Sequence, residues 1–172
     1  MKARSFSHTG ITVADFSAFV TWYADIFGAR LVGVSESDSA RVRSFFGVDA
    51  EMPKCRIGWL RLPSGGILEI FGFEPHEPMH EVVWNRVGLT HIGIDVRNTY
   101  KWHDHLVKKG VEIVSPPEQS RHGHTFMFAK DLEGNLIELI DLRRMYPLLK
   151  WGGALAGFLT RRGRYKQYYL DS

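Results

Sequence analysis

The sequence has one cysteine, Cys55, and no long hydrophobic run. A single cysteine excludes an internal disulfide framework and is typical of a protein kept in a reducing compartment. The longest largely apolar stretch, Met145 to Thr160, is too short and too interrupted to cross a bilayer. The first residues hold no apolar signal core. We therefore expect a cytoplasmic protein in which Cys55 is a small packing residue rather than a nucleophile.

The sequence also has no glycine-rich phosphate loop, no hydrolase nucleophile elbow and no zinc-finger spacing. These absences argue against the protein classes that depend on such motifs. The hydrophobic fraction of 44% and charged fraction of 24% fit an ordinary globular protein with nothing disordered. The length of 172 residues is enough for one buried core or for two small modules that share one.

The formal net charge of +3 hides an uneven distribution. Residues 143–172 hold seven Lys or Arg side chains and one acidic residue, Asp171. Residues 1–142 therefore hold the other fifteen basic and eighteen acidic side chains, a net charge of −3. Because the basic character belongs to the C-terminal segment, the high pI says little about a substrate.

Two pieces of the sequence occur twice. His8-Thr-Gly-Ile-Thr-Val13 returns as His91-Ile-Gly-Ile-Asp-Val96, and Leu68-Glu69-Ile70 returns as Ile137-Glu138-Leu139. Each half begins with a histidine on a β-branched run and ends with a glutamate between aliphatic residues. Two histidines and two carboxylates at equivalent points of a repeat predict a divalent metal site on a pseudo-twofold axis.

Hydrophobic periodicity predicts the order β-α-β-β-β in each half. In the first half we expect a helix over 16–27 and strands at 5–13, 29–34, 56–62 and 67–73. In the second half we expect a helix over 98–109 and strands at 89–96, 111–115, 125–130 and 135–142. The predicted fold is α+β: two tandem modules, 1–73 and 89–142, joined by a linker over 74–88 and followed by a helical extension over 143–172. The two sheets are expected to face each other and enclose a cavity.

The repeat is longer in its first half. The offset in residue number is 83 between the two histidines but only 69 between the two glutamates. We place the difference of fourteen in Ser37–Lys54. This insert is predicted to form a short helix or a loop over the site.

Strand alternation places Glu69 and Glu138 between apolar neighbours on inward faces. An unpaired carboxylate there would cost several kcal/mol, and a bound dication would compensate. Taken singly, His8 and His91 are better explained as hydrogen-bonded core histidines than as metal ligands, and Glu69 is better explained as an edge-strand carboxylate. The equivalence of all four favours one divalent metal per chain. Two imidazoles and two carboxylates without thiolate suit an open Ni, Co, Zn, Fe or Mn centre.

The segment Lys130-Asp-Leu-Glu-Gly-Asn-Leu-Ile-Glu-Leu-Ile140 is similar to the ending of modules in the vicinal oxygen chelate superfamily, which includes glyoxalase I, bleomycin resistance proteins and extradiol dioxygenases. The resemblance covers residues 5–142, with Leu132 where that family usually has proline. It implies a metal-dependent lyase or isomerase that moves a proton on a small α-oxo or α-hydroxy substrate, such as a thiol adduct, through a metal-bound enediolate. Glu69 or Glu138 would be the base, and we favour Glu138 because the second-module glutamate is present in nearly every metal-dependent branch.

The same resemblance leaves three alternatives. Methylmalonyl-CoA epimerases share the fold but typically carry glutamine where Glu69 stands. Iron extradiol dioxygenases use two histidines and one carboxylate, so a fourth ligand would crowd the positions needed for catechol and oxygen. Drug-binding modules generally lack the metal ligands.

The remaining predictions concern substrate and partners. Arg121, His122 and His124 lie in a loop before a predicted strand and are candidates for substrate contact. We expect a small-molecule substrate, a homodimer and, without any recognition motif, no nucleic acid. Residues 143–172 are predicted to dock an apolar helical stripe on their own or a partner's module; the alternative is weak association with a membrane surface.

Overall fold

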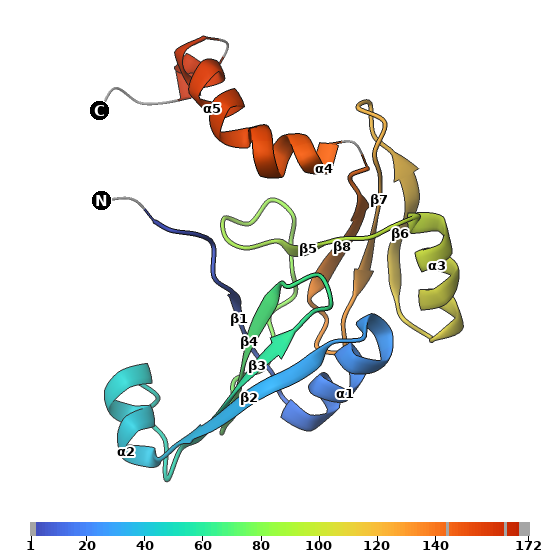
Figure 1. Ribbon diagram of the computed structural model, residues 1–172. Helices are drawn as coiled ribbons and strands as arrows, with labels where there is room; N and C mark the ends of the chain where they lie inside the picture. Colours follow the sequence, from blue (N-terminus) through green and yellow to red (C-terminus); the bar gives the residue numbers. More distant parts are fainter. Residues whose placement is uncertain (1–2, 144, 164, 169–172) are drawn as a thin grey trace. The chain divides into compact units, whose positions relative to one another are not determined.

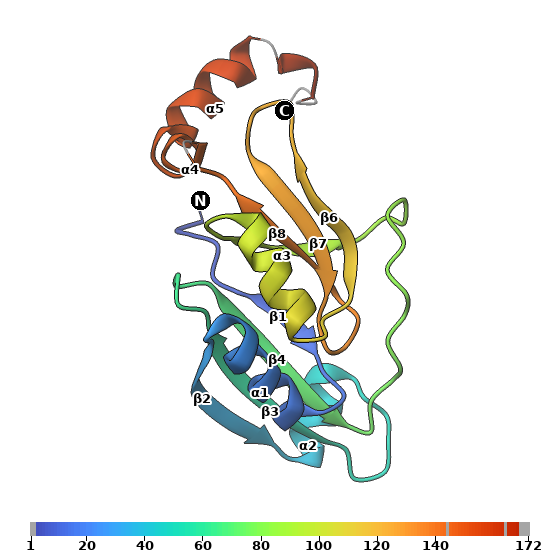
Figure 2. The same cartoon turned by 90° about the vertical axis from the view of Figure 1, so that its right-hand side faces the viewer.

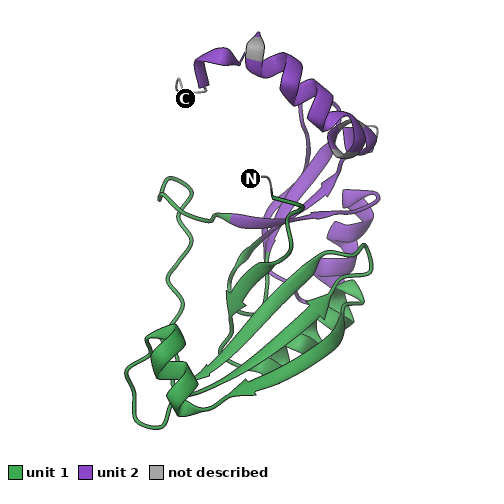
Figure 3. Cartoon of the chain, turned by 60° about the vertical axis from the view of Figure 1, so that its left-hand side comes forward, with its two compact units in different colours: residues 1–90, 130–136 green, residues 91–129, 137–172 purple. Residues whose placement is uncertain are grey.

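The structure is a computed structural model that describes residues 3–143, 145–163 and 165–168 (Figure 1). The chain forms two compact units (Figure 3). Unit 1 comprises Met1–Thr90 and Lys130–Leu136, and unit 2 comprises His91–Ala129 and Ile137–Ser172. The two four-stranded sheets belong to the two predicted repeats.

The first repeat has the predicted order β-α-β-β-β. Its elements are β1 (Thr9–Thr12), α1 (Phe16–Phe27), β2 (Arg30–Ser37), β3 (Lys54–Arg61) and β4 (Ile67–Glu74). The strands lie in the order β1-β4-β3-β2. β1 runs parallel to β4, and the other pairs are antiparallel. The parallel pair brings the beginning of the module beside its last strand.

Helix α1 begins and ends at the predicted residues. The Asp15 carboxylate accepts a hydrogen bond from the Ala18 amide over 2.9 Å, as an N-cap does. Gly28 ends the helix with φ of 68°, a left-handed conformation that favours glycine. Phe19 and Tyr23 on its apolar face are fully buried.

One face of the first sheet is covered by α1 (Figure 2). The Phe16 ring lies so close to β3 that a Cβ atom added at Gly58 would stand 2.5 Å from its Cζ atom. On β4 a Cβ atom at Gly72 would come within 3.3 Å of the Phe16 Cβ atom. The residues that alternate with these glycines, including Trp59 and Phe71, are half-buried on the opposite face. That second face is where the predicted ligands lie.

The second repeat has the same architecture. Its elements are β5 (His91–Asp95), α3 (Thr99–Lys108), β6 (Ile113–Gln119), β7 (Thr125–Lys130) and β8 (Leu136–Asp141), with the strand order β5-β8-β7-β6. The Asn98 side chain caps α3 by accepting a hydrogen bond from the Lys101 amide. The offset in residue number from Asp15 to Asn98 equals that from His8 to His91, so the caps repeat with the histidines.

Three predicted strands differ from the observed ones by three or more residues at one end. β1 begins at Thr9 and leaves His8 just before it, although the alternation began at residue 5. β2 continues to Ser37 beyond the predicted end at Val34. β6 begins later than predicted, at Ile113, and continues through two prolines to Gln119. β6 is an edge strand with two irregularities in its pairing, and such a position tolerates proline because fewer ladder hydrogen bonds are lost.

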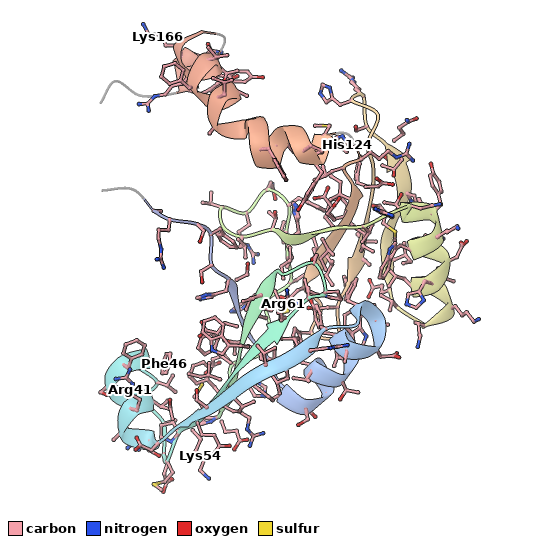
Figure 4. All side chains as sticks on the ribbon, in the orientation of Figure 1. Arg41, Phe46, Lys54, Arg61, His124 and Lys166 are labelled. Atoms are coloured by element: carbon pink, nitrogen blue, oxygen red, sulfur yellow. The ribbon has the colours of Figure 1, made fainter. Side chains whose placement is uncertain are left out.

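The predicted insert contains a short helix. It consists of α2 (Ser39–Arg41) followed by a π-helical turn, η1 (Val42–Phe46), and Figure 4 shows the Arg41 and Phe46 side chains on it. The Phe46 ring contacts the rings of Phe71 and Phe73 on β4, at centroid distances of 6.0 and 5.3 Å. The insert therefore packs on the face of the first sheet that α1 leaves open. The linker over 75–90 has no helix or strand, and all of it is described.

The C-terminal segment is helical over most of its described length. Its elements are α4 (Met145–Pro147), the π-helical η2 (Leu148–Gly152), α5 (Gly153–Arg162) and the 3-10 turn η3 (Lys166–Tyr168). Arg144, Arg164 and Asp171 lie outside the described residues, as do the side chains of Leu148, Lys150 and Arg162. Among the helices that the structure describes, none combines the length and hydropathy needed to pass through a bilayer.

Candidate functional site

In unit 1 the predicted ligands His8 and Glu69 are in direct contact. The His8 Nε2 atom lies 3.0 Å from the Glu69 Oε2 atom. The His8 Nδ1 atom lies 3.0 Å from the Ser7 hydroxyl oxygen, so both ring nitrogens have polar neighbours. The side chains are 32% and 18% exposed, which leaves the pair partly open to a ligand.

Sheet register explains why this pair forms. Glu69 on β4 lies between Gly10 on β1 and Trp59 on β3, and residues paired across strands point to the same face. A Cβ atom added at Gly10 would stand 3.4 Å from the Phe71 Cε2 atom. The Trp59 ring meets the His8 ring at a centroid distance of 5.0 Å and an interplanar angle of 76°. The histidine is therefore held by a carboxylate on one side and an aromatic edge contact on another.

Unit 2 repeats this arrangement with His91 and Glu138. The His91 Nε2 atom lies 3.4 Å from the Glu138 Oε2 atom, and the side chains are 30% and 20% exposed. Gly93 on β5 lies beside the carboxylate, where an added Cβ atom would stand 3.6 Å from Glu138 Oε2. The Phe128 ring meets the His91 ring at 5.4 Å and 80°.

The aromatic partners of the two histidines were not predicted from the sequence. The offset in residue number from Trp59 to Phe128 is the same as that from Glu69 to Glu138. The turns agree with this offset: the Leu62 amide donates to the Gly66 carbonyl, and the Asp131 amide donates to the Asn135 carbonyl. A search of the sequence for pairs of aromatic residues separated by the same offset as Glu69 and Glu138 would have found both partners.

The donor atoms of each pair suit a shared metal ion. Two ligand atoms that each lie about 2.1 Å from one ion stand about 3.0 Å apart at a right angle and about 3.4 Å apart at a tetrahedral angle. The observed separations of 3.0 and 3.4 Å match these values. Within either unit, however, the described residues bring no third His, Cys, Asp or Glu to the pair. Each unit therefore holds two of the four predicted ligands.

The weaker candidates lie farther along the second sheet. Arg121 and His122 are exposed in the turn before β7, and His122 donates from its amide to the Ser120 hydroxyl. His124 is half-buried, with its Nδ1 atom 2.9 Å from the Ser120 Oγ atom. It shares a face of β7 with Phe126 and Phe128, and Phe126 lies between it and the ring that contacts His91. His124 is thus on the same face as the His91–Glu138 pair but not in contact with it.

Cys55 is buried on β3, as predicted. Burial raises the pKa of its thiol to about 11. Because only the thiolate is an effective nucleophile, this cysteine is unreactive at neutral pH. Cys55 also lines a cavity of about 870 Å³ in unit 1, beside Phe73 and the Glu36–Arg56 ion pair. Neither His8 nor Glu69 borders this cavity.

Comparisons with solved structures place the fold among glyoxalase-like proteins. A glyoxalase family protein from Bacillus cereus is similar with a TM-score of 0.69 and 18% identity, over 82% of this chain and 95% of the other. A glyoxylase/bleomycin resistance protein/dioxygenase domain from Frankia sp. EAN1pec has a TM-score of 0.62 and 16% identity, over 81% and 92%. Glyoxalase I from Zea mays has a TM-score of 0.58 and 20% identity, over 78% of this chain and 43% of the maize chain.

At these identities the structural similarity establishes the fold alone. No curated protein sequence matches the chain. The family model described as Glyoxalase/Bleomycin resistance protein/Dioxygenase superfamily matches residues 5–139, which is most of the chain and both predicted modules. The family resemblance that the segment 130–140 indicated is therefore confirmed, and the chain belongs to the Glyoxalase/Bleomycin resistance protein/Dioxygenase superfamily.

Proposed function

We propose that this protein is a metal-dependent lyase or isomerase of the glyoxalase I type, acting on a small α-oxo or α-hydroxy substrate such as a thiol adduct. One observation carries the proposal: each unit holds a histidine and a glutamate whose donor atoms lie 3.0 or 3.4 Å apart and whose side chains are partly exposed. A protein that only enclosed a hydrophobic drug would have no need for two such pairs at equivalent places.

In this proposal His8, Glu69, His91 and Glu138 bind one divalent ion together. When bound, such an ion would act as a Lewis acid toward oxygen atoms of the substrate. The mixed nitrogen and oxygen donor set suits Ni, Co, Zn, Fe or Mn. Trp59 and Phe128 would each pack against one of the two ligand imidazoles.

The proton transfer is assigned to a glutamate of the same set. Glu138 is the proposed base, with Glu69 as the alternative, because a carboxylate beside the substrate can take a proton from one carbon and return it to another. Glu138 lies between Leu136 and Ile140 along β8, and its side chain is 20% exposed. His124 and the adjacent loop would contact the far end of a substrate.

Metal content tests the proposal directly. Purified protein reconstituted with each candidate metal and dialysed should hold close to one ion per chain by elemental analysis. His8→Ala and His91→Ala should each lose most of it, whereas His76→Ala, in the exposed linker, should keep it. Unchanged stoichiometry in His91→Ala would refute the assignment. Wild-type protein that held no ion would instead favour a non-catalytic binding module. The predicted homodimer can be checked on the same samples by analytical ultracentrifugation.

A further inference from the structure

The C-terminal segment carries a large apolar surface that its own unit does not cover. Trp151 is 82% exposed, Leu155 67% and Leu159 60%. These residues recur at intervals of four along η2 and α5, which places them on one stripe of the helix. The family domain ends at residue 139, so this stripe belongs to an accessory segment and not to the module that holds the His–Glu pairs.

The same segment is strongly basic. Residues 143–172 contain seven Lys or Arg side chains and a single acidic residue, Asp171, near the end of the chain. Lys166 lies in η3, just beyond α5, and is exposed; Figure 4 labels it at that end of the segment. Tyr168, two residues later, is also exposed. Apolar and aromatic side chains therefore stand next to a concentrated positive charge.

We propose that residues 145–168 bind the surface of an anionic phospholipid bilayer. The helix would lie in the plane of the interface, with Trp151, Leu155 and Leu159 inserted among the acyl chains near the headgroups. Tryptophan and leucine on one face and cations beside them are the composition that such interfacial helices use. The segment is too short and too charged to span the bilayer, so it would rest on the surface.

Charge decides between this partner and a second copy of the chain. Two copies that met through their stripes would bring two basic segments together, and like charges would oppose that contact. An anionic lipid surface instead attracts each nearby Lys or Arg, by an amount equivalent to about fivefold in affinity per residue. Glycines 152, 153 and 157 weaken an isolated helix, so a surface that orders the helix would stabilise it.

The test uses the full-length protein and vesicles. Flotation with phosphatidylcholine vesicles in which roughly one lipid in three is phosphatidylserine should recover the protein, while pure phosphatidylcholine vesicles should not. Raising NaCl from about 50 to about 500 mM should weaken the binding at least tenfold because salt screens the attraction. Lys166→Glu should weaken it by more than about fivefold, since it removes one positive charge and adds a negative one.

Matched variants separate the apolar stripe from the charge. The double variant Trp151→Glu/Leu155→Glu should lose vesicle binding. Ala156→Glu, an exposed position on the same helix outside the stripe, adds one of the same charges and should retain most of the binding. Circular dichroism and metal content should be unchanged in all variants. Equal binding to neutral vesicles, no binding to anionic ones, or full binding by the double variant would overturn the proposal. So would a change from dimer to monomer in the double variant without any vesicle binding, because the stripe would then be a subunit interface.

Discussion

The Tyr23 hydroxyl donates a hydrogen bond to the Asp131 carboxylate over 3.1 Å, and both side chains are buried in unit 1. Asp131 also accepts hydrogen bonds from the backbone amides of Glu133 and Asn135. Burial raises the pKa of Asp131 above its ordinary value, and the hydrogen bonds that the carboxylate accepts offset only part of this rise. The contact joins helix α1 to the turn between β7 and β8.

The first prediction removes that hydrogen bond. Tyr23→Phe should lower the free energy of unfolding by about 1–3 kcal/mol, because the buried carboxylate keeps its desolvation penalty and loses one donor. Urea denaturation followed by circular dichroism measures this. Tyr168→Phe, at an exposed position, is the control and should change the free energy by less than about 0.5 kcal/mol. Equal stability of both variants would mean that the Tyr23 hydroxyl contributes nothing.

The second prediction concerns Cys55 at alkaline pH. Its folded-state pKa of about 11 lies above the value of 9.0 for an exposed thiol. Between these pH values the unfolded chain releases the proton and the folded chain keeps it, so stability falls as the pH rises from about 9 to about 11. A pKa difference of this size corresponds to a loss of at most about 2.7 kcal/mol.

Cys55→Ala should abolish the part of the stability loss at alkaline pH that ionisation of the thiol causes. Ionisation of the buried Tyr23, whose pKa is also raised by burial, adds a further loss above pH 10 in both proteins. The difference in the free energy of unfolding between wild type and variant, measured by urea unfolding at pH 8, 9, 10 and 11, isolates the contribution of the thiol. A constant difference across this range would contradict the prediction.

The third prediction tests the packing of α1 on its sheet. Gly58→Ala should destabilise the protein by about 1–3 kcal/mol, because the new methyl group would stand 2.5 Å from the Phe16 ring. Gly33→Ala on β2 is the matched control, since nothing lies within 4 Å of an added Cβ atom there. Combining Gly58→Ala with Phe16→Ala should remove this clash and so recover the part of the lost stability that the clash causes. If the Phe16 ring moves aside freely, both glycine variants will unfold at the same urea concentration.

The sequence was sufficient to predict elements that local chemistry determines. The helix over 16–27 has its cap, its apolar spacing and its terminating glycine close together in the chain, between Asp15 and Gly28, and it forms as predicted. The strand Thr125–Lys130 alternates buried and half-buried residues, and its predicted bounds are the observed ones. Internal repetition predicted the shared architecture of the two modules.

Features that depend on pairing between distant strands were not predictable in the same way. The Trp59–His8 contact exists only because β3 pairs with β4 in a particular register and β1 lies beside β4. The extension of β6 through Pro116 and Pro117 depends on its place at the edge of the sheet. Both are tertiary properties that one strand's sequence does not contain. The sharing of one ion by His8, Glu69, His91 and Glu138 stays a prediction for the metal analysis.

The last prediction assigns the proton transfer. Glu138→Gln should lower kcat by about 10²–10⁴ on the first substrate found among α-oxoaldehyde–thiol adducts and acyl-CoA thioesters, because an amide cannot act as a base at neutral pH. The variant keeps the size and shape of the side chain, so its circular dichroism should match the wild type, and measured metal content must accompany every rate. Glu118→Gln, exposed on the edge strand β6, is the matched control and should keep full activity. If Glu69→Gln loses kcat while Glu138→Gln retains both metal and rate, the base is the first-module glutamate. Full activity of both metal-loaded variants would exclude either carboxylate as the base.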